Sequence, residues 1–254
     1  MKIARFKTED KRSYYGTING DEIKVINGLN NLKTTGETYQ LKEVKLLAPT
    51  NPSKIICIGL NYIDHARELK LSLPEEPLIF LKAPTAVIGP NDNIKYPKMS
   101  NQVDHEAELA VVISKKCRDV KAEEAYGFIA GYTAFNDVTA RDLQRKDGQW
   151  TRAKSFDTFA PIGPWITTKD EIPDPHSLDI ELRLNGEIRQ NSNTKNMIFK
   201  IPKLIEFISE IMTLNKGDVI STGTPPGVGQ VKPGDSLEVK IEKIGTLKNQ
   251  IIPG

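Results

Sequence analysis

The sequence has few of the features that mark secreted, membrane or nucleic-acid-binding proteins. Its 254 residues include only 2 cysteines, Cys57 and Cys117, which are too few for a disulfide framework. No apolar run approaches the roughly 18 residues that span a membrane, and the first residues lack a signal-peptide core. Basic and acidic residues nearly balance, 35 against 33, with no long block of one sign. We therefore expect a cytoplasmic protein with neither nucleic acid nor membrane as its partner.

Several well-known catalytic motifs are also missing. The glycine-rich residues 222–229 lack the Gly-Lys-Ser/Thr ending of a phosphate-binding loop and the G-x-G-x-x-G spacing of a dinucleotide site. The sequence has no serine nucleophile elbow and no His-Glu-x-x-His pair. Nucleotide binding, serine hydrolysis and zinc proteolysis of these types therefore have no support.

The pattern of apolar residues predicts more strands than helices. Hydrophobic residues make up 38% of the chain and charged residues 27%, which is typical of a globular protein. An i, i+3, i+4, i+7 stripe predicts one amphipathic helix at residues 201–212. Strands are expected at residues 55–58, 78–82, 178–184, 219–221 and 236–241. Because strands and helices do not alternate regularly, we expect an α+β fold with a mixed, barrel-like sheet.

A boundary is expected near residue 52. The Asn19-Gly20 pair predicts a hairpin turn within a small β-rich module. Two prolines in residues 46–52 are typical of a linker, and an apolar strand begins at Ile55. The sequence thus predicts an N-terminal module at residues 1–52 and a second domain at residues 53–254.

Residues 104–113 combine an apolar strand with two acids that strands seldom contain. Glu106 and Glu108 are two residues apart, so on a strand both side chains project from the same face. Carboxylates held this close repel each other unless a proton or cation lies between them, and Mg²⁺ prefers such oxygen ligands. The alternative is an edge strand with two solvated acids. On the same alternation, His105 is expected to point away from the two acids.

Asp137 ends a second strand-like run, residues 131–137. An acid at this place is either the N-terminal cap of the following helix-like residues 138–144 or a third oxygen ligand contributed by a neighbouring strand. The local sequence does not separate these two interpretations.

Further polar residues are candidates for binding or catalysis. His65 and Glu68 follow the strand at residues 55–58 and would be i, i+3 neighbours on a helix, either as an oriented acid–base pair or as an ordinary surface ion pair. Arg141 and Gln144 have the same spacing and either clamp a substrate carboxylate or face solvent. His176, between a proline and a serine, is expected to be a solvated loop residue.

Taken together, these stretches resemble the fumarylacetoacetate hydrolase family, in its smaller bacterial and archaeal form. The resemblance extends over about residues 54–250, whereas the first fifty residues match loosely. The similar passages, in chain order, are residues 58–68, 80–84, 105–110, 135–144, 154–165 and 221–225.

The resemblance implies a catalytic domain with a mixed β-roll and a role for each candidate residue. Glu106, Glu108 and Asp137 match the ligands of Mg²⁺ or Mn²⁺, with Ca²⁺ as a substitute in crystals. His65 and Glu68 match an acid–base pair on a lid, and Lys154 matches a cation beside the metal. The positions that match substrate contacts, or that lie in matching passages near them, are Arg141, Gln144, Thr224 and Lys82.

The resemblance also implies a reaction class. The large hydrolases carry a fourth acidic ligand upstream of the catalytic histidine, and residues 55–60 contain no acid. The three-carboxylate branch includes acylpyruvases, isomerases, decarboxylases and dehydratases that share a metal-stabilised enolate. We expect hydrolytic C–C cleavage of an acylpyruvate-type 2-oxo acid, with isomerisation, decarboxylation or dehydration of a 2-oxo or 2-hydroxy-diene-dioic acid as the alternative. A catalytically silent metal-binding scaffold is the non-enzyme alternative.

A homodimer is expected on two grounds. Family members usually form one, and the aromatic passage at residues 155–165 contains Phe156, Phe159 and Trp165. Large apolar patches are uncommon on the surface of monomers, so this passage is expected to lie against a second subunit.

Overall fold

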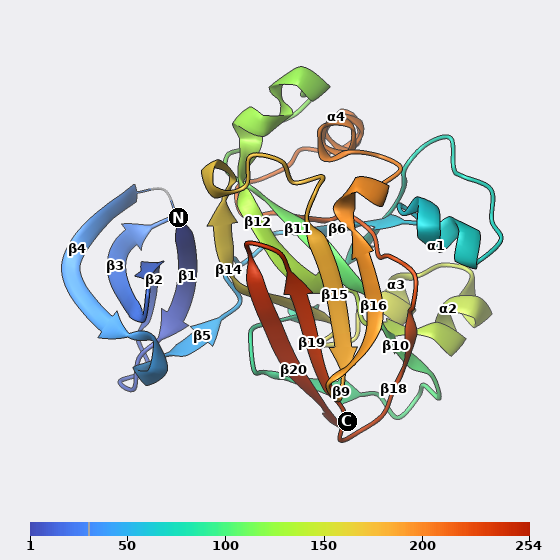
Figure 1. The fold of residues 1–254 in the computed structure, drawn as a ribbon, viewed down its shortest axis with the longest axis horizontal. Coiled ribbons are helices and arrows are strands. Elements are labelled where there is room, and N and C mark those ends of the chain that lie inside the picture. The colour runs from blue at the N-terminus through green and yellow to red at the C-terminus, as the bar shows by residue number, and fades with distance from the viewer. Residues whose placement is uncertain (30) are drawn as a thin grey trace.

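The computed structural model describes residues 1–29 and 31–254, whose strands form three sheets (Figure 1). Ten strands of the largest sheet lie side by side in the order β4 (Asn31–Gln40), β3 (Glu22–Gly28), β2 (Ser13–Asn19), β1 (Lys2–Lys7), β14 (Ala160–Thr168), β12 (Ile129–Asn136), β11 (Ala107–Ile113), β17 (Val219–Ser221), β6 (Ile55–Gly59) and β7 (Leu78–Lys82). Two short strands join it, β5 (Lys45–Leu47) beside β1 and β8 (Val87–Ile88) beside β14. The β17–β6 and β14–β8 pairs are parallel and the others antiparallel, so the sheet is mixed.

Two smaller sheets complete the strand framework. The first has the order β13 (Thr139–Ala140), β10 (Val103–His105) and β18 (Gly229–Val231). The second has the order β16 (Glu187–Asn193), β15 (Asp179–Leu184), β19 (Ser236–Ile241), β20 (Gly245–Pro253) and β9 (Asn93–Tyr96). The expected α+β class is confirmed, and the sheets are open where the sequence predicted a barrel-like form.

Helices are short in the described part of the chain. The α-helices are α1 (Ile63–Glu68), α2 (Arg141–Asp147), α3 (Thr151–Lys154) and α4 (Ile201–Ile211). The 3₁₀ turns are η1 (Leu41–Glu43), η2 (Pro84–Ala86), η3 (Ala122–Phe128), η4 (Lys169–Glu171) and η5 (Thr194–Asn196). Among these residues no helix is long and apolar enough to cross a membrane.

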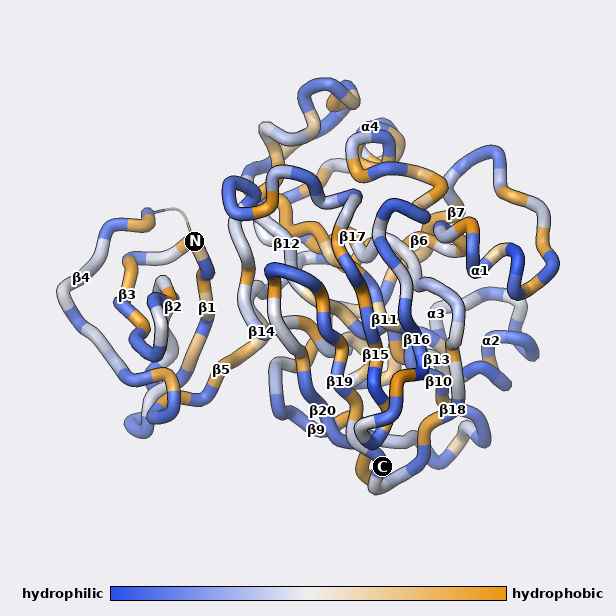
Figure 2. The backbone as a smooth tube through the Cα atoms, viewed as in Figure 1, coloured by the Kyte–Doolittle hydropathy of each residue, from blue (hydrophilic) through white to orange (hydrophobic). Residues whose placement is uncertain are grey.

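The amphipathic helix predicted at residues 201–212 is α4, and its stripe packs into the main core. Ile201, Leu204, Ile205 and Ile208 are fully buried, each contributing about 1.5–3 kcal/mol by its removal from water. Ile211, the last residue of the helix, is in contrast 48% exposed. Figure 2 shows hydrophobic stretches along the central strands β11, β12 and β17, against which this core forms.

The strand expected at residues 104–113 is interrupted at Glu106. Before the break, β10 pairs with β13 and β18, and after it β11 pairs with β12 and β17 in the large sheet. The chain thus passes from one sheet to another at this residue, and the backbone N–H of Glu106 donates to the side-chain oxygen of Asn136 (2.9 Å). This crossing places Glu106 at the edge of the large sheet where β11 begins.

The N-terminal strands extend the large sheet. The expected hairpin is the β2–β3 pair, with Gly20 in the left-handed region (φ 60°) that its turn requires. The β1 strand pairs with β14 at Lys2–Thr167 and Ile3–Ile166. In Figure 1, β1–β4 stand on one side of the molecule, and α1, α2 and α3 lie on the opposite side.

Candidate active site

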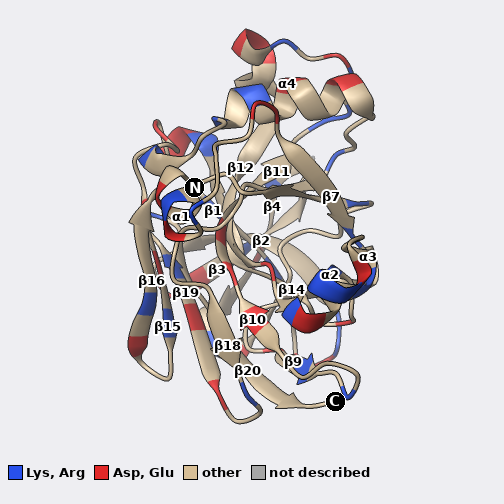
Figure 3. Ribbon diagram, turned by 90° about the vertical axis from the view of Figure 1, so that its right-hand side faces the viewer, with Lys and Arg blue, Asp and Glu red and all other residues tan. Residues whose placement is uncertain are grey.

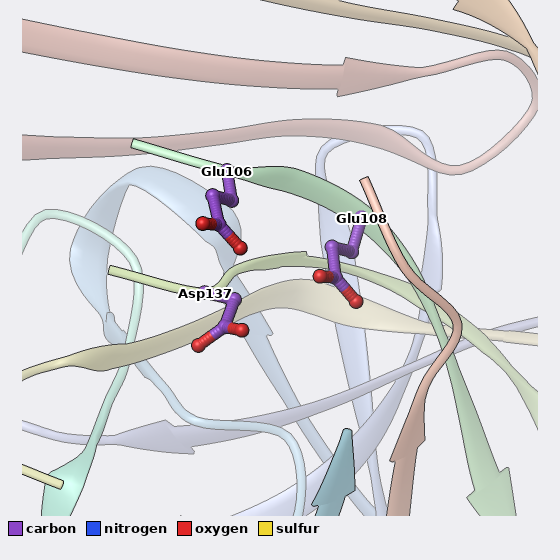
Figure 4. Close-up of side chains that lie close together, drawn as sticks. All are labelled: Glu106, Glu108 and Asp137. Atoms are coloured by element: carbon purple, nitrogen blue, oxygen red, sulfur yellow. The ribbon is translucent and has the colours of Figure 1, made fainter. Parts of the chain in front are cut away.

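Three acidic side chains meet where β11 and β12 reach the same edge of the large sheet. Glu108 lies on β11, Glu106 is the residue before that strand, and Asp137 is the residue after β12. One carboxylate oxygen from each lies within 4.8 Å of those of the other two, and all three residues are buried. Figure 4 shows the three side chains close together, with the Glu106 carboxylate directed toward Asp137. The strand register produces this cluster, because Asp137 N–H donates to the Glu106 carbonyl (2.8 Å) and Ala107 pairs with Asn136.

This geometry decides between the two interpretations of Asp137. Helix α2 begins four residues later, and its N-cap residue is Ala140, with no side-chain cap. The Asp137 carboxylate instead accepts hydrogen bonds from Lys154 Nζ (2.6 Å) and Lys82 Nζ. Asp137 is therefore part of the acidic cluster and not the cap of the helix.

The electrostatics of the cluster suit a divalent cation. Burial raises the pKa of Glu108, and the charges of Asp137 and Glu106 raise it further. Burial also opposes ionisation of Glu106, but Lys154 and Arg141 more than offset this and hold its pKa well below the usual value. Three converging carboxylates are the hard oxygen donors that Mg²⁺ and Mn²⁺ prefer, so these residues fit such an ion.

Basic residues surround the acids. Lys154, at the end of α3, is buried, and its Nζ donates to Glu106 (2.9 Å) as well as to Asp137. Arg141, on α2, donates to Asp104 (2.9 Å) and to Glu106, and its Nη1 donates to Gln144 (2.6 Å). Much of this positive charge is thus already paired with carboxylates.

A cavity of about 350 Å³ opens onto the acidic cluster, a size suited to a small organic acid. Phe80 and Trp150 form one wall as an edge-to-face pair with ring centroids 5.0 Å apart, and Lys154 Nζ lies 4.9 Å from the Phe80 ring. The remaining lining residues are Ile58, Gly59, Leu60, His65, Leu69, Leu71, Glu106, Glu108, Asp137, Arg141, Gln144, Arg145 and Thr224.

The expected acid–base pair lies at this cavity. His65 Nδ1 and Glu68 Oε2 are 2.9 Å apart on α1, and the imidazole is 12% exposed whereas Glu68 is 43% exposed. If Nδ1 carries the proton that Glu68 accepts, Nε2 presents a lone pair and is a competent base. Glu68 Oε1 also accepts from the Gly227 N–H (3.0 Å). Only glycine fits there, because its φ is +91° and a Cβ would lie 2.0 Å from the Arg189 carbonyl oxygen.

Lys82 lies elsewhere than expected. It is 1% exposed and is not among the described residues that line the cavity. Its Nζ donates to Asp137 and to the Val138 carbonyl (3.0 Å). This side chain lies behind the acidic cluster, where it holds Asp137, so its position does not suit direct contact with a substrate. Arg141, Gln144 and Thr224 do line the cavity.

Gln190, a buried residue on β16, is absent from the sequence-based candidates. Its Oε1 accepts from the Ala107 N–H (2.9 Å) and faces His105 Nδ1 (3.1 Å). Its Nε2 donates to Thr224 Oγ1 (2.8 Å) and to the Pro225 carbonyl (2.9 Å). Gln190 therefore fixes the Thr224 loop against the strand that carries the acids. His105 contacts this amide, on the side away from the acidic cluster.

One further expectation needs correction, and another gains no structural support. His176 is not a solvated loop residue, because its Nε2 accepts from the Ile201 N–H (3.1 Å) at the start of α4 and its side chain is 16% exposed. Phe159 is fully buried within its own chain, and Trp165 Nε1 donates to the Ile244 carbonyl (2.7 Å). The aromatic passage is thus largely satisfied inside one subunit and gives the expected homodimer no support.

The fold and the acidic cavity define a protein of mixed open sheets with a candidate divalent-cation centre. Comparison with known families agrees: a family model described as Fumarylacetoacetate (FAA) hydrolase C-terminal matches residues 54–252, and one described as Rv2993c-like, N-terminal, matches residues 1–49. The chain belongs to the fumarylacetoacetate hydrolase family.

Several relatives and solved structures that are similar to this chain carry the names of enzymes. The mitochondrial oxaloacetate tautomerase fahd2 of Xenopus laevis is 49% identical over 219 residues, which cover 82% of this chain and 69% of that protein. The structure of 5-carboxymethyl-2-hydroxymuconate delta-isomerase from Mycobacterium smegmatis has a TM-score of 0.93 at 44% identity, with both chains fully covered. Maleylpyruvate hydrolase from Sphingobium sp. SYK-6, solved with manganese(II) and pyruvate, has a TM-score of 0.85 at 31% identity, also with full coverage.

Proposed function

We propose that this protein is a divalent-metal-dependent enzyme that forms the enolate of a 2-oxo acid. The observation that carries the proposal is the cavity in which Glu106, Glu108 and Asp137 converge and which is also lined by His65, the partner of Glu68. An Mg²⁺ or Mn²⁺ ion held by these carboxylates would act as a Lewis acid toward the carboxylate and keto oxygens of a 2-oxo acid. Support for this ion comes from the manganese and pyruvate in the 31%-identical hydrolase.

The chain's own residues supply the rest of the chemistry. Lys154 holds a fixed positive charge beside Glu106 and Asp137, where negative charge would develop on the substrate. His65 Nε2 takes a proton from the substrate carbon or from water, and Glu68 stabilises the imidazolium that results. Phe80 and Trp150 exclude water from one wall of the cavity.

Keto–enol tautomerisation of a 2-oxo dicarboxylic acid is the reaction that we favour. The 49%-identical relative is an oxaloacetate tautomerase and the 44%-identical neighbour is an isomerase. Both reactions add a proton to a carbon atom or remove one from it by way of an enolate, and both require one base such as His65. Hydrolytic cleavage of an acylpyruvate, the reaction expected from the sequence, is the second candidate, since the 31%-identical neighbour is a maleylpyruvate hydrolase.

Enol absorbance together with pyruvate release distinguishes the two reactions. The protein is treated with a chelator, reloaded with Mg²⁺ or Mn²⁺, and mixed with the enol of oxaloacetate or with acetylpyruvate. Tautomerisation removes the enol absorbance without releasing pyruvate, whereas hydrolysis releases pyruvate that lactate dehydrogenase detects. We expect the first result with oxaloacetate. If neither metal restores activity toward either acid, the proposed function is wrong.

We also propose that residues 53–254 carry the whole site and that residues 1–52 form an accessory module. Every candidate site residue lies after residue 60, and the N-terminal strands lie on the side of the molecule opposite α1–α3 (Figure 1). A cytoplasmic location and a homodimer remain predictions of the sequence and the resemblance.

A further inference from the structure

Arg145 differs from the other basic residues that line the cavity. Lys154 is bonded to Glu106 and Asp137, Arg141 to Asp104 and Glu106, and the imidazole of His65 to Glu68. Arg145 forms no ion pair with any carboxylate in residues 1–29 and 31–254, and its Nη1 donates only a long bond to Gln102 (3.3 Å). It is therefore a cation at the cavity wall whose charge no described acid neutralises.

The charges in and behind the acidic cluster leave Arg145 free for a second substrate carboxylate. The buried or partly buried acids and bases that cluster there are Asp104, Glu106, Glu108 and Asp137 with Lys82, Arg141 and Lys154. With all of them ionised, four acids outnumber three bases, and a divalent cation would leave one positive charge. That charge balances the single carboxylate at the 2-oxo end of a substrate. A second carboxylate needs another cation, and Arg145 is the lining residue that can supply it.

Helix α2 places Arg145 suitably for this contact. Arg141 and Arg145 are four residues apart, so their side chains leave the same face of the helix, and both line the cavity. Figure 3 shows Lys and Arg positions in blue along α2. Lys146, the residue after Arg145, is not a lining residue. Leu69 and Leu71 also line the cavity and offer an apolar surface to the carbons between the two carboxylates.

We propose that Arg145 binds the distal carboxylate of a 2-oxo dicarboxylic acid and thereby selects such acids over monocarboxylic ones. This inference rests on the proposed function, because it assumes that the 2-oxo end lies at the acidic cluster. A guanidinium suits the role, since its planar fork can donate two parallel hydrogen bonds to one carboxylate. Arg145 is exposed in the structure, so a substrate can reach it without disrupting an ion pair.

Matched pairs of acids test the contact. Each pair differs only in a terminal carboxylate or methyl group: oxaloacetate with 2-oxobutanoate, and 2-oxoglutarate with 2-oxopentanoate. Calorimetric titration in Mg²⁺ gives the affinities for the wild type, Arg145→Met and the control Lys146→Met. The control removes the same charge from the neighbouring position, which does not line the cavity.

We expect the wild type to prefer the dicarboxylic acid of at least one pair by about 10-fold or more, the usual effect of a charged hydrogen-bonded pair. Arg145→Met should lose that preference and keep its affinity for the monocarboxylic acid within about twofold. Lys146→Met should keep the preference. Turnover of oxaloacetate should likewise fall in Arg145→Met and stay close to the wild-type level in Lys146→Met.

The other outcomes separate this inference from the proposed function. If the wild type binds none of the four acids, the proposed function is wrong and the inference is wrong with it. If the wild type binds both acids of each pair equally well, or if Arg145→Met keeps the preference, the inference alone is overturned. Equal losses in Arg145→Met and Lys146→Met would show a general effect of surface charge and would also overturn it.

Discussion

Replacing Glu108 by glutamine isolates its charge from its other contacts. Glu108 is 1% exposed, and its Oε2 accepts hydrogen bonds from Ser221 Oγ and from the Gly223 N–H (2.7 Å). The amide oxygen of a glutamine has the same reach and can accept both bonds. Glu108→Gln therefore removes one negative charge and one anionic oxygen ligand, and both Ser221 and Gly223 keep their hydrogen-bond acceptor.

The distances set the expected size of the effect. Two ionised carboxylates whose oxygens lie no more than 4.8 Å apart repel by about 3.5 kcal/mol or more at an effective dielectric constant of about 20, before nearby lysines reduce this, and the repulsion adds to burial in raising the pKa of Glu108. The metal-free variant should therefore be at least as stable as the metal-free wild type. A cation at about 100 times its dissociation constant should add about 2.7 kcal/mol to the wild type, or about 5–10 °C in melting temperature for a chain of this size. The variant lacks one of the three anionic ligands and should bind the cation more weakly. Its stability should therefore rise by less than about a quarter of this amount.

Thermal denaturation after chelator treatment, with and without Mg²⁺ or Mn²⁺, measures this difference. Glu238→Gln is the control, because Glu238 is a partly exposed acid paired with Lys248 and lies outside the cavity. The control should melt and respond to metal as the wild type does. An equal metal-dependent shift in Glu108→Gln, or no shift in the wild type with either metal, would refute the reasoning.

Three further predictions concern histidines and the buried amide. His65→Ala should lower kcat by about 10²–10⁴-fold while calorimetric affinity for oxalate changes little, and an unchanged kcat would exclude His65 as the base. Gln190→Met should lower kcat/KM by about tenfold or more but leave Mg²⁺ affinity unchanged, because the amide bonds to Thr224 and to the Ala107 backbone and to none of the three carboxylates; equal loss of both would contradict this. Burial and Lys200 lower the pKa of His176, so the unfolded chain binds more protons and the helix cap at Ile201 loses its stabilisation as pH falls below about 6.5. Urea denaturation should therefore show that His176→Ala costs about 0.5–2 kcal/mol at pH 8 and less at pH 5.5, and equal costs at both pH values would reject this account.

Local patterns predicted the pairing of Glu106 with Glu108, whereas only the family resemblance added Asp137 to the acidic cluster. The apolar run after Glu108 fixes a buried strand, and the two-residue spacing places Glu106 and Glu108 on one side of the chain. The helix at residues 201–212 was predictable for the same reason, since its apolar stripe repeats with the helical period.

The remaining features depend on contacts between distant residues. The break at Glu106 arises because β10 and β11 pair with different sheets, and no local pattern specifies those partners. Gln190 lies in a polar stretch whose neighbours are partly or fully exposed, so its sequence does not reveal that it alone is buried between the Thr224 loop and β11. His176 caps a helix that begins 25 residues later. Lys82 was expected at the substrate because it lies in a passage that resembles the family, and the structure places it behind Asp137.

The most direct test of the central claim, enolate formation, is deuterium exchange at carbon 3 of a 2-oxo acid. The protein, Mg²⁺ and 2-oxobutanoate or 2-oxoglutarate are mixed in D₂O, and proton NMR follows the loss of the carbon 3 signal. The account predicts exchange with the wild type well above the rate for Mg²⁺ alone, with little exchange after chelation or in Glu108→Gln. It also predicts a rate about 10²-fold or more lower in His65→Ala. Wild-type protein that binds these acids but leaves the carbon 3 protons in place would contradict the account.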